Sequence, residues 1–130
     1  GFKRYRERLT RERRFIELVL ESRRQLAALY REDLAPAPMR VEKKRFFAEL
    51  RARYHEGSEW FGKGYEQWLA EDLNNAKLAL IATYHEQIPA FEHLLALHDG
   101  DFEVFYLAVE EIGGLSPRER MARMQSLAVD

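Results

Sequence analysis

The chain contains no cysteine and only four prolines and seven glycines among its 130 residues. The lack of cysteine excludes disulfide bonds and metal sites built on thiolates, and it leaves the cellular compartment open. No apolar run approaches the roughly 18 residues that a transmembrane helix needs. The opening Gly-Phe-Lys-Arg-Tyr-Arg is not followed by the apolar core of a signal peptide. We therefore expect a soluble segment that makes no membrane contact.

The residues that are present indicate one folded domain. Hydrophobic residues make up 46% of the chain and charged residues 33%, which is typical of a globular protein. The length fits a single domain over residues 1–130. Because the chain starts with Gly1 rather than Met, we expect either an expression scar or a piece of a longer protein.

Charge is distributed unevenly along the sequence. The net charge is −1, yet residues 1–32 hold ten basic and five acidic residues, a net of +5, which leaves −6 for the remainder. A basic arm raises the possibility of a nucleic-acid-binding module. However, glutamates recur among the arginines at helical spacings, as on a solvated helix face: Glu7, Glu12, Glu17 and Glu21. We favour the solvated face and expect no nucleic acid as a partner.

Hydrophobic spacing predicts a helical hairpin at the start of the chain. Apolar residues recur with a period near 3.6 over residues 2–31 and again over residues 39–55. Pro36 and Pro38 separate the two segments, and the short loop favours an antiparallel arrangement. The expected apolar stripes are Phe15, Leu18, Val19, Leu26, Leu29 and Tyr30 in the first helix, and Val41, Phe46, Phe47, Leu50 and Tyr54 in the second.

Residues 57–68 combine three glycines with four large aromatic residues, Trp60, Phe61, Tyr65 and Trp68. The glycines at 57, 62 and 64 predict an irregular loop that the aromatic side chains pin in place. Two interpretations fit this composition: a structural loop that covers the hairpin, or an aromatic wall of a cleft. We favour the structural loop.

Further short helices are expected toward the C-terminus, and no segment shows the alternation of a strand. One helix is predicted over residues 73–84, and Pro89 either kinks it or starts the next helix. Asp101 is a candidate N-cap for a fifth helix that Gly113-Gly114 ends. The residues expected to face the core are Leu73, Ala76, Leu80, Ile81, Tyr84, Phe91, Leu94, Leu95, Phe102, Phe105, Tyr106, Val109 and Ile112.

Ser116-Pro117-Arg118-Glu119 is a capping box with proline at the first helical position, and it predicts the start of one more helix. The last short helix would bury Met121, Met124 and Leu127. The fold class predicted from the whole pattern is therefore all-α, with a hairpin and further short helices in one domain.

The sequence contains no complete metal site. His85-Glu86-Gln87-Ile88-Pro89 begins like the HExxH zinc motif, but Pro89 stands where the second histidine ligand is needed. His93 and His98 are five residues apart and fall on different helix faces. We predict no metal ligands and no cofactor in this chain.

Two consecutive asparagines open the predicted third helix. Asparagine is a poor helix former but a good N-cap, so Asn74 or Asn75 is expected to cap this helix, with Tyr84 half-buried at its other end. This purely structural interpretation is the one that the residues favour when taken alone.

Three stretches of the chain, in the same order, resemble the C-terminal part of a bacterial family of zinc aminopeptidases. The first is Arg13-Arg14-Phe15-Ile16 through Leu29-Tyr30, followed by Lys44-Arg45-Phe46-Phe47-Ala48-Glu49-Leu50-Arg51. The second, and the most specific, is Leu73-Asn74-Asn75-Ala76-Lys77-Leu78-Ala79-Leu80, with Ala82-Thr83-Tyr84-His85 and Pro89-Ala90-Phe91-Glu92. The third is Phe105-Tyr106 with Ser116-Pro117-Arg118-Glu119-Arg120.

The resemblance implies that the chain is the C-terminal domain of a longer enzyme. In that family the HExxH motif and a downstream glutamate ligand precede the region matched here, so zinc is implied for the parent protein only. The implied partners are the upstream catalytic domain of the same polypeptide and a peptide substrate. The family looks like envelope lipoproteins, which implies a location in the cell envelope or periplasm, and this chain alone should be inactive.

Four residues are the candidates for a role in such an enzyme. The resemblance and their positions suggest Asn74, Asn75 and His85 as substrate-binding residues and Tyr84 as the catalytic one. A phenol hydroxyl donates readily to the oxyanion formed in peptide hydrolysis, which favours Tyr84. The main alternative is a non-enzymatic helical interaction module whose first helix docks a partner.

Overall fold

A computed structural model describes residues 1–88 and 91–97, together with residues 106, 107, 110, 111, 114, 116, 118, 119, 122 and 123. In this part of the chain every element is a helix: α1 (Phe2–Tyr30), α2 (Pro36–Glu56), α3 (Ser58–Phe61), α4 (Glu66–Ala70), α5 (Asn75–Gln87) and α6 (Phe91–Leu97). The predicted all-α class is confirmed.

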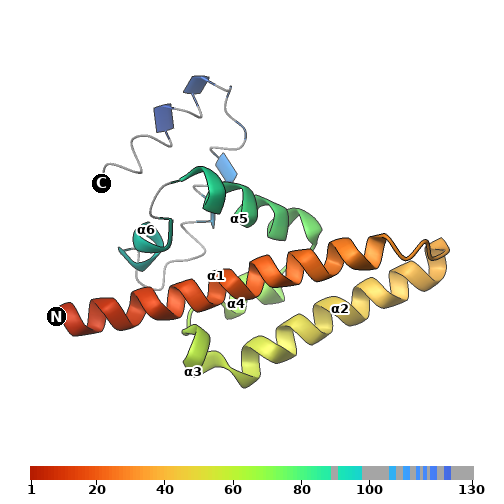
Figure 1. Cartoon of the computed structure of the whole chain (residues 1–130), viewed down its shortest axis with the longest axis horizontal. Coiled ribbons are helices and arrows are strands. Elements are labelled where there is room, and N and C mark those ends of the chain that lie inside the picture. Colours follow the sequence, from red (N-terminus) through yellow and green to blue (C-terminus); the bar gives the residue numbers. More distant parts are fainter. Residues whose placement is uncertain are drawn as a thin grey trace.

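Helix α1 is the centre of the architecture and runs the length of the molecule (Figure 1). The hairpin partner α2 and the short α3 lie on one side of it, and α5 and α6 lie on the other side. Helix α5 runs back along α1, so its first turn lies beside the C-terminal turns of α1. A single long helix therefore brings the two halves of the chain together.

Helix α2 begins at Pro36, three residues earlier than predicted. Proline is tolerated in the first turn of a helix because the amide groups there have no acceptor within the helix. Ala35 is extended, with φ −61° and ψ 157°, as a following proline requires. The two prolines therefore start the second helix as well as separating it from the first.

The hairpin buries most of the two predicted stripes. The buried members are Phe15, Leu18, Val19 and Leu26 in α1, and Phe47, Leu50 and Tyr54 in α2. Two members were predicted wrongly, since Tyr30 is 40% exposed and Val41 is 64% exposed. Both lie toward the loop end of the hairpin, which extends beyond α5, so no third element covers them (Figure 1).

Residues 57–70 are more regular than predicted, because they form the short helices α3 and α4 around a tight connection. Gly62 and Gly64 have φ angles of 96° and 107°, a region that side chains with a Cβ rarely adopt. A Cβ on Gly62 would also lie 3.3 Å from the Cβ of Arg11 on α1. Glycine at 62 therefore permits both the turn and its close approach to α1.

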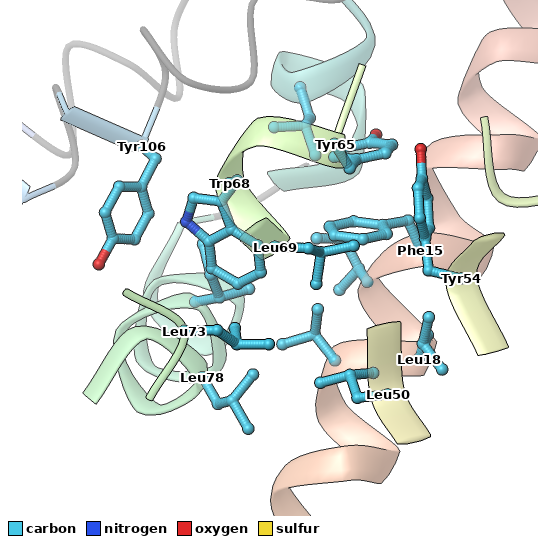
Figure 2. Packing of buried hydrophobic residues seen from close by; sticks show 14 of the residues in the cluster. Phe15, Leu18, Leu50, Tyr54, Tyr65, Trp68, Leu69, Leu73, Leu78 and Tyr106 are labelled. Atoms are coloured by element: carbon cyan, nitrogen blue, oxygen red, sulfur yellow. The ribbon is translucent and has the colours of Figure 1, made fainter. Parts of the chain in front are cut away.

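The aromatic residues of this segment fill the centre of the core. The ring of Phe15 stacks on Tyr65 with centroids 3.6 Å apart, and it meets Tyr54 and Trp68 edge-on at 5.9 and 6.1 Å (Figure 2). Tyr65 and Trp68 are nearly fully buried, whereas Trp60 is 58% exposed. The structural interpretation of these aromatics is thus confirmed for Tyr65 and Trp68.

Helix α5 spans Asn75–Gln87 rather than residues 73–84, and its buried face differs from the predicted one. Ala76 is exposed, whereas Leu78 and Ala82 are buried together with the expected Ile81. The packing of α5 against α1 selects this face. Leu73 is buried as predicted, but it lies before the helix.

Several predicted features of the C-terminal part lie outside the described residues: Pro89, Asp101, Gly113, Phe102, Phe105, Val109, Ile112, Met121, Met124 and Leu127. Tyr106 is described, and it is buried with its ring 5.6 Å from that of Trp68. The capping interaction of the last predicted helix is confirmed, because the Ser116 hydroxyl accepts from the Glu119 amide (3.3 Å) and donates to its carboxylate (2.7 Å).

Candidate functional site

All four predicted site residues lie on or beside α5, but at opposite ends of it. Asn74 and Asn75 stand at its start, and Tyr84 and His85 lie in its last turns. Ten residues of helix separate Asn75 from His85, which corresponds to about 15 Å along the axis. The structure therefore does not bring the four side chains into one constellation.

Asn74 is the N-cap of α5, as the structural interpretation predicted. Its Oδ1 accepts a hydrogen bond from the Lys77 amide at 3.0 Å, and its Nδ2 donates to the Asp72 carbonyl at 2.9 Å. Both ends of the side-chain amide are thus engaged in the turn that starts the helix. Its predicted substrate-binding role stays a prediction.

Asn75, the first residue of α5, lines a cavity of about 510 Å³ with residues from the C-terminal part of α1. The other lining residues are Arg23, Arg24, Ala27, Tyr30 and Arg31, and we call this hollow the arginine cavity. Three arginines and an asparagine give its wall basic and polar groups beside the apolar surface of Ala27 and Tyr30. Asn75 is therefore the predicted site residue that faces a binding-sized hollow.

Tyr84 lies in the hydrophobic core and is only 2% exposed, rather than half-buried as expected. Its ring shares the core with residues of α1 and with Ile88, which is 1% exposed. No described residue forms a hydrogen bond with its hydroxyl. The catalytic role of Tyr84 stays a prediction, and the packing of its ring is what a core tyrosine would show.

His85 joins the end of α5 to α6. Its Nε2 lies 3.1 Å from Glu92 Oε1, and its ring meets Phe91 edge-on at 5.7 Å. About a quarter of each of these two side chains remains exposed. His85 is thus held by a carboxylate of its own chain, and its substrate-binding role stays a prediction.

Sequence reasoning missed a polar cluster in which Tyr54 of α2 ties down the glycine-rich turn. The Tyr54 hydroxyl lies 2.7 Å from the Gly62 carbonyl and 3.2 Å from Glu66 Oε1. Burial and the nearby Glu66 carboxylate raise the pKa of Tyr54 above 10, its ordinary value, so the phenol stays protonated and donates. The available signal was the pair of glycines at 62 and 64 followed closely by an acidic residue, Glu66.

Glu66 is the acidic partner in this cluster. Burial acts to raise the pKa of Glu66, but hydrogen bonds from its own amide, the Gly64 amide and the Tyr54 hydroxyl outweigh burial. Its pKa consequently lies below the ordinary 4.5. The cluster holds a charged carboxylate at the turn between α3 and α4.

Lys77 is a second residue that sequence reasoning did not single out. Its ammonium donates to the carbonyls of Trp68 (3.0 Å) and Glu71, and it lies 5.3 and 5.8 Å from the ring centroids of Trp68 and Tyr106. This lysine of α5 therefore links its helix to the backbone at the C-terminal end of α4. Its bonding to backbone carbonyls gives it a structural role.

Four further cavities, of 350, 460, 530 and 550 Å³, lie along the N-terminal half of α1 and around α3. Arg14 borders three of them, and it stacks on the exposed Trp60 with 3.5 Å from Cζ to the ring centroid. Each of the four has both arginine and glutamate in its wall. Mixed charge of this kind suits contacts with solvent or another polar surface.

Metal-binding chemistry finds no support among these side chains. Across residues 1–88 and 91–97 and the isolated later positions that the structure describes, no three histidine, aspartate or glutamate side chains are grouped so that they could hold a metal ion. The described residues therefore offer no ready-made group of ligands for a metal ion. In the same described portion, no helix is long and apolar enough to span a membrane.

The comparison with protein families identifies the chain. No curated protein and no solved structure matches it. The family model described as "Putative aminopeptidase" matches residues 2–124, which includes every helix from α1 to α6. The chain therefore belongs to this aminopeptidase family.

Proposed function

We propose that residues 1–130 are the helical C-terminal domain of a zinc-dependent aminopeptidase and line its substrate cleft. The observation that carries the proposal is the family match over residues 2–124, which includes the stretch around Asn74 and His85. Zinc would be bound by an upstream catalytic domain that carries the HExxH motif, in keeping with the absence of a group of three or more metal ligands among the described residues here. Such a protein would work in the cell envelope.

Within this proposal the surface that faces the substrate lies at the junction of α1 and α5. Asn75 and the arginine cavity provide polar groups there that are open to a ligand. His85 would contribute at the far end of α5, where part of its ring stays exposed beside Glu92. Tyr84 would reach a substrate only if the packing around it changed, since its ring is now in the core.

The test uses the protein encoded by the complete reading frame. We expect zinc-dependent hydrolysis of short peptides, which is lost when the first histidine of the upstream HExxH motif is replaced, and lost as well when residues 1–130 are removed. Residues 1–130 alone should hydrolyse nothing. Peptide release is followed by chromatography, and zinc is counted by metal analysis after dialysis.

Two outcomes would contradict the proposal. A zinc-loaded full protein that cleaves no peptide would leave a non-enzymatic helical interaction module as the better assignment, with α1 docking a partner. Full activity without residues 1–130 would show that this domain does not line the cleft.

A further inference from the structure

The arginine cavity differs from the four other cavities in its charge. Among the described residues, its wall contains three arginines and no carboxylate, whereas each of the four cavities along α1 and α3 named above has at least one glutamate in its wall. A hollow of about 510 Å³ is large enough for a small organic ligand. A group of guanidinium ions of which only one is paired with a described carboxylate favours an anion as that ligand.

Two of the three arginines are free to hold such an anion. Arg24 is engaged, since its Nη2 lies 2.6 Å from Glu21 Oε2. Arg23 and Arg31 form no ion pair with any described residue, and both are exposed. A further cation, Lys43 of α2, has its ammonium 5.4 Å from the centroid of the Tyr30 ring that borders the cavity.

The spacing along α1 explains why these side chains surround one hollow. Arg23, Ala27 and Arg31 are four residues apart, so they lie on the same face in successive turns. The middle position carries only a methyl group, which leaves room between the two longer side chains. The cavity is therefore a consequence of a small residue flanked by two arginines.

The start of α5 lies on the other side of the cavity and presents hydrogen-bond donors with partial positive charge. The amides in the first turn of a helix have no acceptor within the helix. In α5, Asn74 accepts from the Lys77 amide, so the amides of Asn75 and Ala76 are the ones that remain. The positive end of the helix dipole adds to the field of the arginines. The Asn75 side chain offers a further donor at the cavity.

We propose that the arginine cavity binds the terminal carboxylate of a short peptide, through Arg23, Arg31 and Asn75. A planar guanidinium group can donate two parallel N–H bonds to the two oxygens of a carboxylate. This geometry suits a carboxylate better than the ammonium group of a lysine would. The identity of the peptide as substrate rests on the proposed function. The parent enzyme then selects peptides short enough to reach the zinc site and this cavity at once.

Binding is tested on the chain of residues 1–130 itself, with dialanine, dialanine amide and inorganic phosphate as probes, by calorimetry or NMR titration at low salt. Dialanine should bind, and dialanine amide, which lacks only the carboxylate charge, should bind at least about tenfold more weakly. The double variant Arg23→Gln/Arg31→Gln should weaken dialanine binding about tenfold and keep its helical circular dichroism spectrum.

Arg4→Gln is the matched control, because Arg4 is also an exposed arginine of α1 and borders none of the five cavities. It should leave dialanine binding unchanged. Equal binding of dialanine and its amide, or equal loss in the control and the double variant, would overturn the proposal. Binding of phosphate without dialanine would also overturn it, in favour of a phosphate site.

The outcome for the proposed function is separate, because this titration needs neither zinc nor turnover. If residues 1–130 bind dialanine through Arg23 and Arg31 but the full protein cleaves no peptide, the carboxylate site stands and the peptidase proposal fails. If residues 1–130 bind neither dialanine nor its amide but the full protein cleaves both equally well, the peptidase proposal stands and the carboxylate site fails.

Discussion

Tyr84 is the residue for which catalysis and structure make opposite demands. An oxyanion donor needs its hydroxyl at the substrate, whereas the observed ring is 2% exposed in the core. Because Tyr84→Phe removes the hydroxyl and keeps the ring, it tests the hydroxyl alone.

In the full protein, a donor role predicts that Tyr84→Phe lowers kcat about 10²- to 10³-fold with little change in KM and little change in stability. If the hydroxyl has no catalytic role, turnover is retained, and the free energy of unfolding changes little as well, because no described residue forms a hydrogen bond with that hydroxyl. Steady-state kinetics therefore separates the two roles, and urea unfolding checks that the variant keeps its fold. Unchanged turnover would end the catalytic assignment.

Glu66 gives the chain a pH dependence of known sign. A carboxyl whose pKa is lower in the folded than in the unfolded state stabilises the fold above its unfolded pKa, and that contribution is lost as the pH falls through the folded pKa. Since the pKa of Glu66 lies below 4.5, its contribution is present at neutral pH and disappears in acid.

We therefore expect Glu66→Gln to destabilise the chain at neutral pH and to make its stability fall less steeply than that of the wild type below about pH 4.5. Urea unfolding at several pH values measures the difference. Glu86→Gln is the control, because Glu86 is exposed on α5. If both variants show the same pH dependence, Glu66 is not the cause.

At the scale of the helix, Asn74 and Asn75 are neighbours with different environments. Asn74 accepts the Lys77 amide as the N-cap of α5, whereas Asn75 is exposed at the arginine cavity. Asn74→Ala should lower the free energy of unfolding by about 1 kcal/mol, and Asn75→Ala should change it by less than about 0.5 kcal/mol. Thermal or urea unfolding of both variants measures this, and equal losses would contradict the capping assignment.

The hairpin of α1 and α2 depends on a single buried stripe of α2. Phe47 is 8% exposed in this stripe, and Val41 on the same helix is 64% exposed. Phe47→Ala should therefore cost about 3 kcal/mol, whereas Val41→Ala should cost less than about 0.5 kcal/mol. A loss below about 1 kcal/mol for Phe47→Ala would mean that the hairpin does not pack as the structure shows.

At the scale of the whole molecule, the basic arm is part of the structural centre. Residues 1–32 carry a net +5, but their helix, α1, contacts α2, α3, α5 and α6 along its length. Glutamates share its exposed face with the arginines, and Glu21 pairs with Arg24. These features limit how much uncompensated positive charge a polyanion would meet.

Binding to single-stranded or duplex nucleic acid should accordingly be weak and insensitive to sequence, and about 200 mM salt should abolish it. Fluorescence anisotropy with labelled oligonucleotides over a salt series measures both properties. A sequence-specific complex that survives that salt concentration would restore the nucleic-acid-binding alternative.

Local signals determined the long helices, because such signals act between residues that are near in sequence, but they missed the short α3 and α4, which lie where an irregular loop was predicted. The 3.6-residue spacing placed α1 and α2, and the asparagine pair marked the start of α5. The error at the start of α2 is small and has a local cause: Pro36 is part of the first turn of the helix, whereas it was predicted to lie in the loop before it. The all-α class needed no tertiary information.

Only the tertiary structure decided which faces are buried and which side chains meet. Spacing on α5 did not show that Ala76 points to solvent or that Tyr84 is fully enclosed, since both depend on where α1 and α6 lie. Nor did the sequence show that Asn75 shares a cavity with Arg23 and Arg31, about 50 residues earlier. Burial and cavity formation arise from contacts between distant segments, and a pattern read along one segment contains no information about its neighbours in space.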